Sequence, residues 1–449
     1  MSGPADDRGR LTRGGGRYLA DLASTDGTLA AGFIRSTVAR GKLLDVDLDP
    51  VRASTGIVGA FAADDLAEVL SPLPVRYGPG RLYDWQLLAR DWVSFVGEPI
   101  AMVVGSDRAS VEEACELASV DFDTLPAVTD VSLARKESED VVRPEVGSNV
   151  LFTMSRHEGD VDQALATAHL VVERRFHRGR GSACPLENRG VLAYEDAATG
   201  ELLVCASTQI PHILRDAIAR VLRRPERSVR VLVPDVGGGF GLKAQVGAEE
   251  CLLACAAHLL KRRVAWVEDR WENLVASNHA RDEHVQLKVG FTRSGAITGV
   301  DAEVVTDVGA HSSYPLSAAL EPASTSSHLF GCYRVPAVRL LAAGVATNKC
   351  PIGAYRGVGA PAAAFAAERI LDDAAAELGL SRLDIRRRNL LGRADMPYRH
   401  VIGGLMDCGD PLGVLEKLVT SLDPGEALSS LTEVAPQSHG PSKGRPRVG

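Results

Sequence analysis

The order of apolar and polar positions along the chain predicts alternating strands and helices. Within residues 93–104, apolar runs on either side of Gly97-Glu98-Pro99 predict two strands. A helical pattern from Ser106 to Ser119 follows, and the apolar alternation of Val120–Asp123 predicts a further strand. This part of the chain is therefore predicted to form a small mixed α/β unit.

The middle of the chain repeats a unit in which a loop leads into a helix. The predicted units are a strand at 202–209 with a helix at 211–221, a strand from 229 with a helix at about 245–260, and a loop at 354–361 with a helix that ends at Leu378. Gly379 is typical of a helix end, and the pair Ser381 and Asp384 is typical of the start of another helix.

Shifts in composition divide the chain into five predicted parts. Charged, apolar-poor residues around 135–140 indicate a linker, and the Pro, Gly and Ser content rises near the C-terminus without an apolar period. The parts are a lead-in at 1–22, an α/β domain at 23–130, a linker at 131–154, a larger domain at 155–420, and a disordered tail at 421–449.

The segment 229–243 carries the strongest candidate chemistry. A β-branched run ends in Gly237, Gly238, Gly239, Phe240 and Gly241, so the backbone can approach a ligand closely. Free N–H groups at the start of the following helix would favour an anion, such as a phosphorylated cofactor. The spacing fits neither a dinucleotide fingerprint nor a P-loop, and a tight structural turn is the alternative.

Composition and charge narrow the classes of partner. The 449 residues are 45% hydrophobic and 24% charged, as in ordinary globular proteins, and the net charge of -8 gives no basic face for nucleic acid. No apolar run reaches membrane-spanning length and no signal peptide is recognisable, so we expect a cytoplasmic protein without a membrane partner. The eight cysteines form no cluster, which predicts reduced, mostly buried thiols and no iron–sulfur centre on this chain.

Five ordered motifs together resemble the molybdopterin-binding large subunit of the xanthine dehydrogenase and aldehyde oxidase family. They lie at residues 96–101, 209–212, 237–243, 266–274 and 354–359, and the resemblance covers roughly residues 11–420. It implies a mixed α/β fold, with an a/b hammerhead domain followed by the first molybdopterin-binding domain. The family's second cofactor-binding domain would be absent from this sequence.

The resemblance also implies a function. Family members carry a molybdopterin cofactor with molybdenum, in bacteria usually in its cytosine dinucleotide form, and add water-derived oxygen to a carbon of a small molecule. Electrons then pass to 2Fe-2S and FAD centres, which in bacterial members are commonly on a small and a medium subunit. This chain is accordingly expected to be part of a multi-subunit oxidoreductase and to hold no metal through its own side chains.

By the same resemblance, three residues would lie at the catalytic centre. Gln209 would offer its side-chain amide to a molybdenum oxygen, Phe240 would lie against the metal face, and Arg356 would sit beside the anionic cofactor. Gly238, Gly239 and Gly241, together with these three, would bind the cofactor. The alternatives are a strand-end amide that satisfies a turn for Gln209 and a surface arginine for Arg356.

Other positions bear on the substrate. Ala244, Ser324 and Val358 replace residues with which purine-oxidising members hold their substrates, and Gly357 replaces the cysteine of the copper-dependent carbon monoxide oxidisers. The resemblance therefore favours an aldehyde or an N-heterocycle over xanthine or carbon monoxide. His212, His279 and His284 share no ligand motif, and we expect them to be core or surface residues.

The family's catalytic glutamate has no counterpart here, since neither Glu426 nor Glu433 has its glycine-rich context. A positioned general base contributes ~10²–10⁴-fold to rate, so the chain alone is expected to be inactive. Three hypotheses follow: one half of a split large subunit completed by a separate chain with the second molybdopterin-binding domain, a truncated product, or a non-catalytic protein that binds subunits or cofactor.

Overall fold

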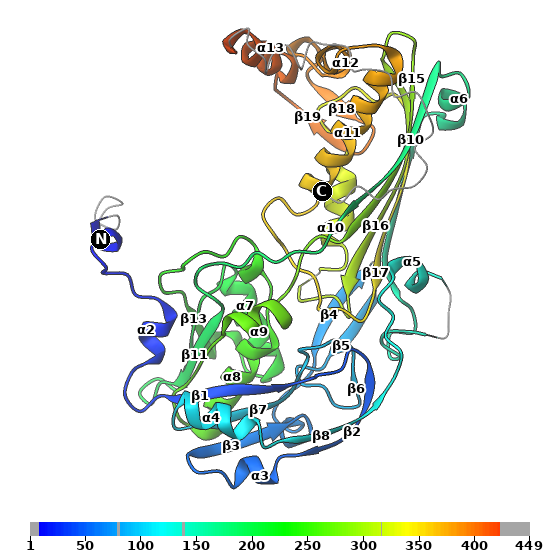
Figure 1. Cartoon of the computed structure of the whole chain (residues 1–449). Helices are drawn as coiled ribbons and strands as arrows, with labels where there is room; N and C mark the ends of the chain where they lie inside the picture. Colours follow the sequence, from blue (N-terminus) through cyan, green and yellow to red (C-terminus); the bar gives the residue numbers. More distant parts are fainter. Residues whose placement is uncertain (1–8, 79–80, 137–139, 316, 423–449) are drawn as a thin grey trace.

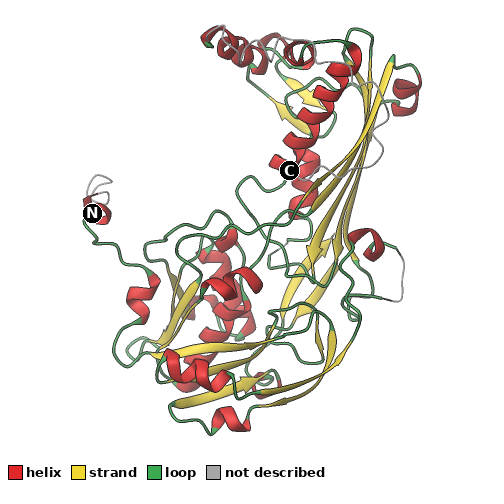
Figure 2. Ribbon diagram, in the orientation of Figure 1, coloured by secondary structure: helices red, strands yellow, loops and turns green. Residues whose placement is uncertain are grey.

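The computed structural model describes residues 9–78, 81–136, 140–315 and 317–422 (Figures 1 and 2). The predicted disordered tail lies outside the described residues from position 423 onward, and so do Glu426 and Glu433. Figure 1 shows a lower body that carries α7, α8 and α9, and a set of long strands that rises from it toward α11, α12 and α13. Among the described residues, no helix is both long and apolar enough to cross a membrane.

Two sheets dominate the architecture. The seven-stranded sheet has the order β13 (Val229–Leu232), β12 (Leu202–Ala206), β11 (Gly190–Glu195), β14 (Val264–Val267), β1 (Leu29–Arg35), β7 (Pro99–Gly105) and β3 (Ile57–Ala62). The five-stranded sheet has the order β10 (Leu170–Arg178), β15 (Glu283–Phe291), β16 (Ile297–Gly309), β17 (Val338–Ala346) and β9 (Val150–Glu158).

Three smaller sheets complete the strands of the described residues. They are β6 (Trp92–Val93), β2 (Gly41–Asp47) and β8 (Ser119–Thr124), then β4 (Leu73–Gly78) with β5 (Arg81–Trp85), and β18 (Tyr398–His400) with β19 (Gly404–Met406). The α-helices are α2 (Leu19–Ala23), α3 (Asp49–Arg52), α4 (Arg108–Cys115), α5 (Val131–Ala134), α6 (Val161–Ala166), α7 (Pro211–Val221), α8 (Ala248–Leu260), α9 (Arg270–Val275), α10 (Leu320–His328), α11 (Ala360–Leu378), α12 (Arg382–Asn389) and α13 (Pro411–Ser421). Four 3₁₀ turns are η1 (Asp64–Leu66), η2 (Glu226–Ser228), η3 (Leu242–Ala244) and η4 (Arg393–Asp395).

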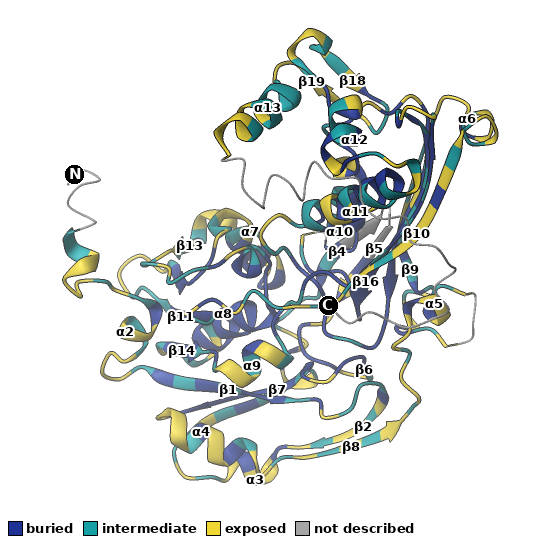
Figure 3. Ribbon diagram, turned by 45° about the horizontal axis from the view of Figure 1, so that its top comes forward, coloured by how far each residue is buried: buried dark blue, intermediate teal, exposed yellow. Residues whose placement is uncertain are grey.

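The seven-stranded sheet contains strands from before and after the predicted linker. Strand β1 pairs in parallel with β14 and antiparallel with β7, so the two parts of the chain share one sheet. Helix α8 is mostly apolar, and its residues from Ala248 to Ala257 are buried against this sheet (Figure 3). A separate core forms where α11 covers the five-stranded sheet, with Val285, Leu287 and Ile370 in its centre.

Several predicted elements are present, some with shifted ends. Helix α7 has the predicted bounds, and α11 ends at Leu378 before Gly379, whose φ of 66° closes it. The Ser381 side chain accepts a hydrogen bond from the Asp384 N–H at the start of α12, as the sequence predicts. The helix predicted over 106–119 is shorter, because Asp107 caps it at Arg108 and β8 already begins at Ser119.

Two differences concern connecting segments. The predicted linker contains helix α5, capped by Asp130, and the first residues of β9. The helix predicted from Gln245 begins at Ala248, because Gln245 is extended and Val246 forms a bridge with Tyr314. All eight cysteines are free, with two of them, Cys184 and Cys408, exposed.

Candidate functional site

The ends of two neighbouring strands place Gln209 beside the glycine loop. Strands β12 and β13 run in parallel, so the residues that follow them emerge at the same edge of the sheet. The Gln209 backbone N–H donates to the Lys243 carbonyl at 2.9 Å, and the Gly241 N–H donates to the Gln209 side-chain oxygen at 2.9 Å. The glutamine is thereby fixed at both its backbone and its side chain.

This contact orients the exposed Gln209 amide. Because its Oε1 accepts from Gly241, its Nε2 is directed away from that contact as a hydrogen-bond donor. Within the described residues, this nitrogen has no hydrogen-bond partner. Gln209 can therefore donate to a ligand without giving up the bond that holds the loop.

The glycine loop leaves no space for side chains at two positions. A Cβ on Gly239 would lie 2.5 Å from the Gln209 side-chain oxygen, and a Cβ on Gly241 would lie 2.6 Å from the Ala354 carbonyl oxygen. Gly241 also has a φ of 102°, which side chains rarely tolerate. Between them Phe240 is about half exposed and has a positive φ of 53°. Close packing therefore explains the alternating glycines.

The same loop presents unused backbone donors. The N–H groups of Gly237 and Gly241 donate to the side chains of Glu187 and Gln209. By contrast, the N–H groups of Gly238, Gly239 and Phe240 have no partner among the described residues. Three consecutive N–H groups can bind an anionic or strongly polar ligand.

The expected anion site at the following helix is not formed. Helix α8 starts only at Ala248, and its first turn holds the buried acidic residues Glu249 and Glu250. Glu249 forms ion pairs with Arg35 and Arg189, at 3.0 Å in each case. These carboxyl groups already occupy the positive end of the helix, so the available donors belong to the loop.

The third motif lies directly against the glycine loop. The Arg356 N–H donates to the Phe240 carbonyl at 2.8 Å. The Arg281 guanidinium donates to the carbonyl oxygens of Arg356 and Val358. Its Cζ atom also lies 4.9 Å from the centre of the Tyr355 ring. The exposed Arg356 side chain has no ion pair or hydrogen bond within the described part of the chain. Its guanidinium is therefore available to a ligand.

A buried ion pair supports the glycine loop. The Lys243 ammonium is fully buried and lies 2.8 Å from the Glu187 carboxylate, which also accepts from Gly237 N–H and from the Ser207 hydroxyl. Burial alone would raise the pKa of Glu187, but these hydrogen bonds hold it below its ordinary value. Sequence reasoning did not identify this pair, since Glu187 is distant from the loop in sequence.

Replacement of Glu187 is expected to destabilise the fold. In Glu187→Gln the buried ammonium loses its counter-charge, and the free energy of unfolding should fall by about 3 kcal/mol, the low end for breaking a buried pair. Because the pKa of Glu187 is lowered on folding, this loss should be full above its unfolded pKa and shrink as the pH falls through the folded pKa. Urea unfolding at pH 7 and at pH 4 measures both effects.

The matched control removes both charges. The double variant Glu187→Gln/Lys243→Met leaves no unpaired ammonium, so it should recover most of the lost stability. If Glu187→Gln alone were as stable as the natural chain at pH 7, the ion pair would not support the loop.

Two buried carboxyl groups lie beneath the Arg356 loop. The Thr325 hydroxyl hydrogen-bonds to the Glu283 carboxyl group and lies 3.2 Å from the Gly359 carbonyl oxygen. It therefore connects Glu283 to the Arg356 loop. Burial, and next the neighbouring Glu321, raise the pKa of Glu283 to about 8, and burial raises the pKa of Glu321 to about 7. A protonated Glu283 at neutral pH therefore adds no negative charge beneath the loop.

Two positions that bear on the substrate lie at this loop, and the third follows the glycine loop. Ser324 accepts a hydrogen bond from the Gly359 N–H at 3.2 Å, and Val358 has a φ of 50° within the same loop. The Ala244 N–H donates to the Gly241 carbonyl at 2.9 Å. None of these three positions therefore carries a charged side chain.

The singled-out histidines occupy different surroundings. His212 is exposed, and the largely buried His279 contacts the Leu274 carbonyl at 2.8 Å. His284 lies instead beside His177 and Asp282, a grouping that the sequence analysis did not anticipate. Among the described residues, His212 and His279 belong to no such grouping.

Comparison with sequence families gives two matches. The profile described as "Molybdopterin cofactor-binding domain" matches residues 142–390. The profile described as "Aldehyde oxidase and xanthine dehydrogenase, a/b hammerhead domain" matches residues 13–126. Together they span nearly the whole described chain, in the order that the sequence motifs predict.

Individual proteins agree with these profiles. The nicotine 6-hydroxylase large subunit of Paenarthrobacter nicotinovorans is 35% identical over 94% of this chain and 51% of its own length. Quinoline 2-oxidoreductase from Pseudomonas putida 86 superposes with a TM-score of 0.89 and 36% identity, covering 92% of this chain and 53% of that one. The chain thus spans about half the length of these relatives. The nicotinate dehydrogenase large molybdopterin subunit of Eubacterium barkeri is 29% identical, over 90% of this chain and 91% of its own length.

Proposed function

Since the chain belongs to the xanthine dehydrogenase and aldehyde oxidase family of molybdopterin-binding large subunits, we propose that it forms the cofactor-binding part of a molybdenum hydroxylase. The observation that carries this proposal is a set of unused hydrogen-bond donors on loops that contact one another directly. These are the Gln209 amide nitrogen, the N–H groups of residues 238–240 and the Arg356 guanidinium. Such a set suits a large anionic ligand.

The surroundings of these donors fit the cofactor. Gly239 and Gly241 let the glycine loop pack closely against Gln209 and Ala354, which brings its unused N–H groups next to the Gln209 amide and the Arg356 loop. The Lys243–Glu187 pair supports the glycine loop, and Arg281 supports the Arg356 loop. Neither contact uses the free donors named above. We propose Gln209, Gly238, Gly239, Phe240, Gly241 and Arg356 as the residues that contact molybdopterin, in its cytosine dinucleotide form.

When bound, molybdopterin with molybdenum provides the centre at which a substrate carbon gains oxygen from water and loses two electrons. This chain's own residues would orient the cofactor and place positive charge beside it. The Gln209 amide would donate a hydrogen bond to an oxygen at the metal, and the Arg356 loop would add positive charge beside it. Phe240 would limit access of water to the same face.

We propose an aldehyde or an N-heterocycle as the substrate. Ala244, Ser324 and Val358 provide no charged side chain with which to orient a purine. The residue after Arg356 is Gly357, which offers no thiolate for a copper ion. The related proteins named above include a nicotine 6-hydroxylase and a quinoline 2-oxidoreductase, which supports a ring carbon next to nitrogen as the reacting atom.

We further propose that the chain works within a complex. Its eight free cysteines are dispersed, so the 2Fe-2S and FAD centres would lie on separate small and medium subunits. A groove of about 1200 Å³ between β1, α4 and α9, with the exposed Trp271 at its side, offers a surface for such partners. We include in the proposed complex a separate chain with the second cofactor-binding domain, and the Eubacterium barkeri relative is itself called a large molybdopterin subunit.

The test is an isotope experiment on the complex purified from its source organism. With quinoline, nicotine or an aromatic aldehyde and a dye as electron acceptor, one ¹⁸O atom from labelled water should enter each product molecule. Product without water-derived oxygen would contradict the hydroxylase proposal. A complex that contains molybdopterin and oxidises none of these substrate classes would favour a binding role without catalysis.

A further inference from the structure

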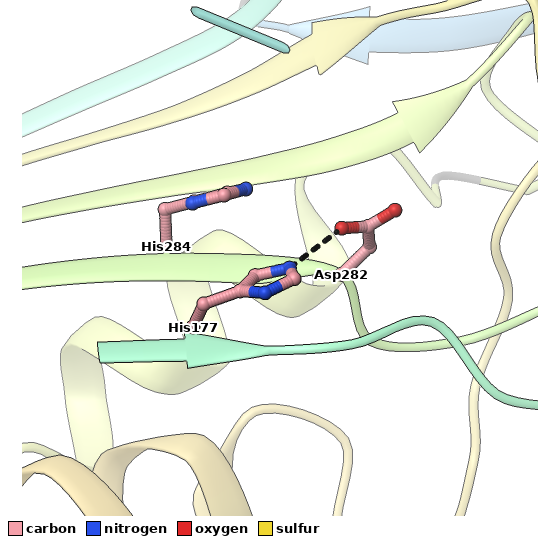
Figure 4. Close-up of side chains that lie close together, drawn as sticks. All are labelled: His177, Asp282 and His284. Atoms are coloured by element: carbon pink, nitrogen blue, oxygen red, sulfur yellow. Dashed lines mark hydrogen bonds and ion pairs between the residues drawn. The ribbon is translucent and has the colours of Figure 1, made fainter. Parts of the chain in front are cut away.

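Two histidines and an aspartate meet at the edge of the five-stranded sheet. His177 on β10 stands directly opposite His284 on β15 in the antiparallel register, and Asp282 comes just before β15 (Figure 4). The imidazole rings are stacked, with centroids 4.3 Å apart and an interplanar angle of 19°. The His177 Nε2 lies 3.3 Å from the Asp282 Oδ1. Three possible metal ligands therefore share one small volume.

We propose that His177, Asp282 and His284 bind a divalent transition-metal ion of the Zn²⁺ class. Their ligand atoms all lie within 4.8 Å of one another, so small side-chain rotations can bring them around one ion. Two imidazoles with one carboxylate suit Zn²⁺, Ni²⁺ or Cu²⁺ better than the oxygen-seeking Mg²⁺ or Ca²⁺. This proposal is independent of the molybdopterin site.

The surrounding charges leave one carboxylate oxygen for the ion. The Asp282 Oδ2 is paired with Arg180 and Lys349, each at 3.2 Å. The same two cations are also paired with Asp307, so these four groups balance in formal charge. The Oδ1 then remains on the side of the histidines. Because Arg180 and Lys349 repel a cation, we expect moderate affinity.

Solvent can reach the proposed site. The His177 side chain is 54% exposed on the edge strand β10, which gives an ion access from solvent.

The trio is joined to the Arg356 loop through a strained dipeptide. Arg281 and Asp282 have φ values of 72° and 70°, which are costly for residues with side chains. Arg281 holds the carbonyls of Arg356 and Val358, while Asp282 lies in the proposed metal site. An ion at Asp282 would therefore help to fix the backbone that positions this loop.

The test is a calorimetric titration of the chelator-treated full chain with ZnCl₂. Cys184→Ser/Cys408→Ser is used as background, so that exposed thiols do not compete. One site is expected, and His177→Ala or His284→Gln should each weaken it by at least about 10–100-fold, because the loss of a residue that only supports a metal ligand already costs that much. His169→Ala, an exposed histidine beside the same strand, should leave the dissociation constant unchanged.

A second readout does not depend on the stability of the variants. With Cu²⁺ in place of Zn²⁺, the electron paramagnetic resonance spectrum should show splitting from two imidazole nitrogens, reduced to one in His177→Ala. Because His177 is exposed, this variant should fold. The proposal is overturned if the chain binds no Zn²⁺, or if His177→Ala binds Zn²⁺ as tightly as the unchanged chain.

Discussion

A Gly241→Val variant is expected to fold and to contain less than about a tenth of the normal molybdopterin. The φ of 102° costs a β-branched residue about 1–3 kcal/mol of folding stability, whereas the cofactor loss is expected from displacement of the loop, because about 1.4 kcal/mol of lost binding free energy is tenfold in affinity. The added Cβ would also lie 2.6 Å from the Ala354 carbonyl, so the glycine loop and the Arg356 loop must separate. Molybdenum and pterin content of the purified protein, with circular dichroism for the fold, provide the measurement.

Gly200→Val is the matched control. Gly200 has a φ of 70°, but no atom lies within 4 Å of the position its Cβ would take. This variant carries a similar backbone strain without a clash at the site, and it should keep its cofactor. If Gly241→Val were loaded as fully as Gly200→Val, the glycine loop would not be the cofactor cradle.

A Gln209→Glu variant is expected to keep its cofactor and to lose about 10²–10³-fold in kcat, the cost of removing one preorganised donor. The new carboxylate can still accept the Gly241 N–H, so the loop should stay in place. Its second oxygen cannot donate, however, and it repels an anionic oxygen at the metal. The measurement is the steady-state rate of the purified complex together with its molybdenum content.

Two further variants help to interpret the Gln209→Glu result. Gln209→Ala should lower kcat and also loosen the loop, because the Gly241 N–H then loses its acceptor. His212→Ala, on the first turn of α7, should behave like the natural protein. Unchanged kcat in Gln209→Glu would contradict the donor role assigned to this side chain.

Local sequence signals predicted the elements that carry the site. Pro211 marks the start of α7, and Gly379 marks the end of α11. The glycine loop follows β13 as expected. These signals act within a few residues, so they can be recognised in a single sequence. The grouping of the loops that carry Gln209, Phe240 and Arg356 was implied by the family resemblance. Their contact with molybdopterin stays a prediction.

Long-range features were not predictable in the same way. Glu187 reaches Lys243 across 56 positions, and Arg281 reaches the Arg356 loop across 75. The pairing of His177 with His284 depends on the register between β10 and β15. Nothing in the local pattern specifies such contacts, because they depend on how distant strands pair. The shared sheet across the predicted linker was missed for the same reason.

The central claim is that this chain binds molybdopterin through the face formed by Gln209, the glycine loop and Arg356. Native mass spectrometry of the tagged chain, isolated from its own host, tests it most directly. The account predicts a complex whose mass includes one molybdopterin cytosine dinucleotide with molybdenum for each copy of this chain, together with FAD-containing and 2Fe-2S-containing subunits. An assembled complex that holds flavin and iron–sulfur centres but no pterin would contradict it.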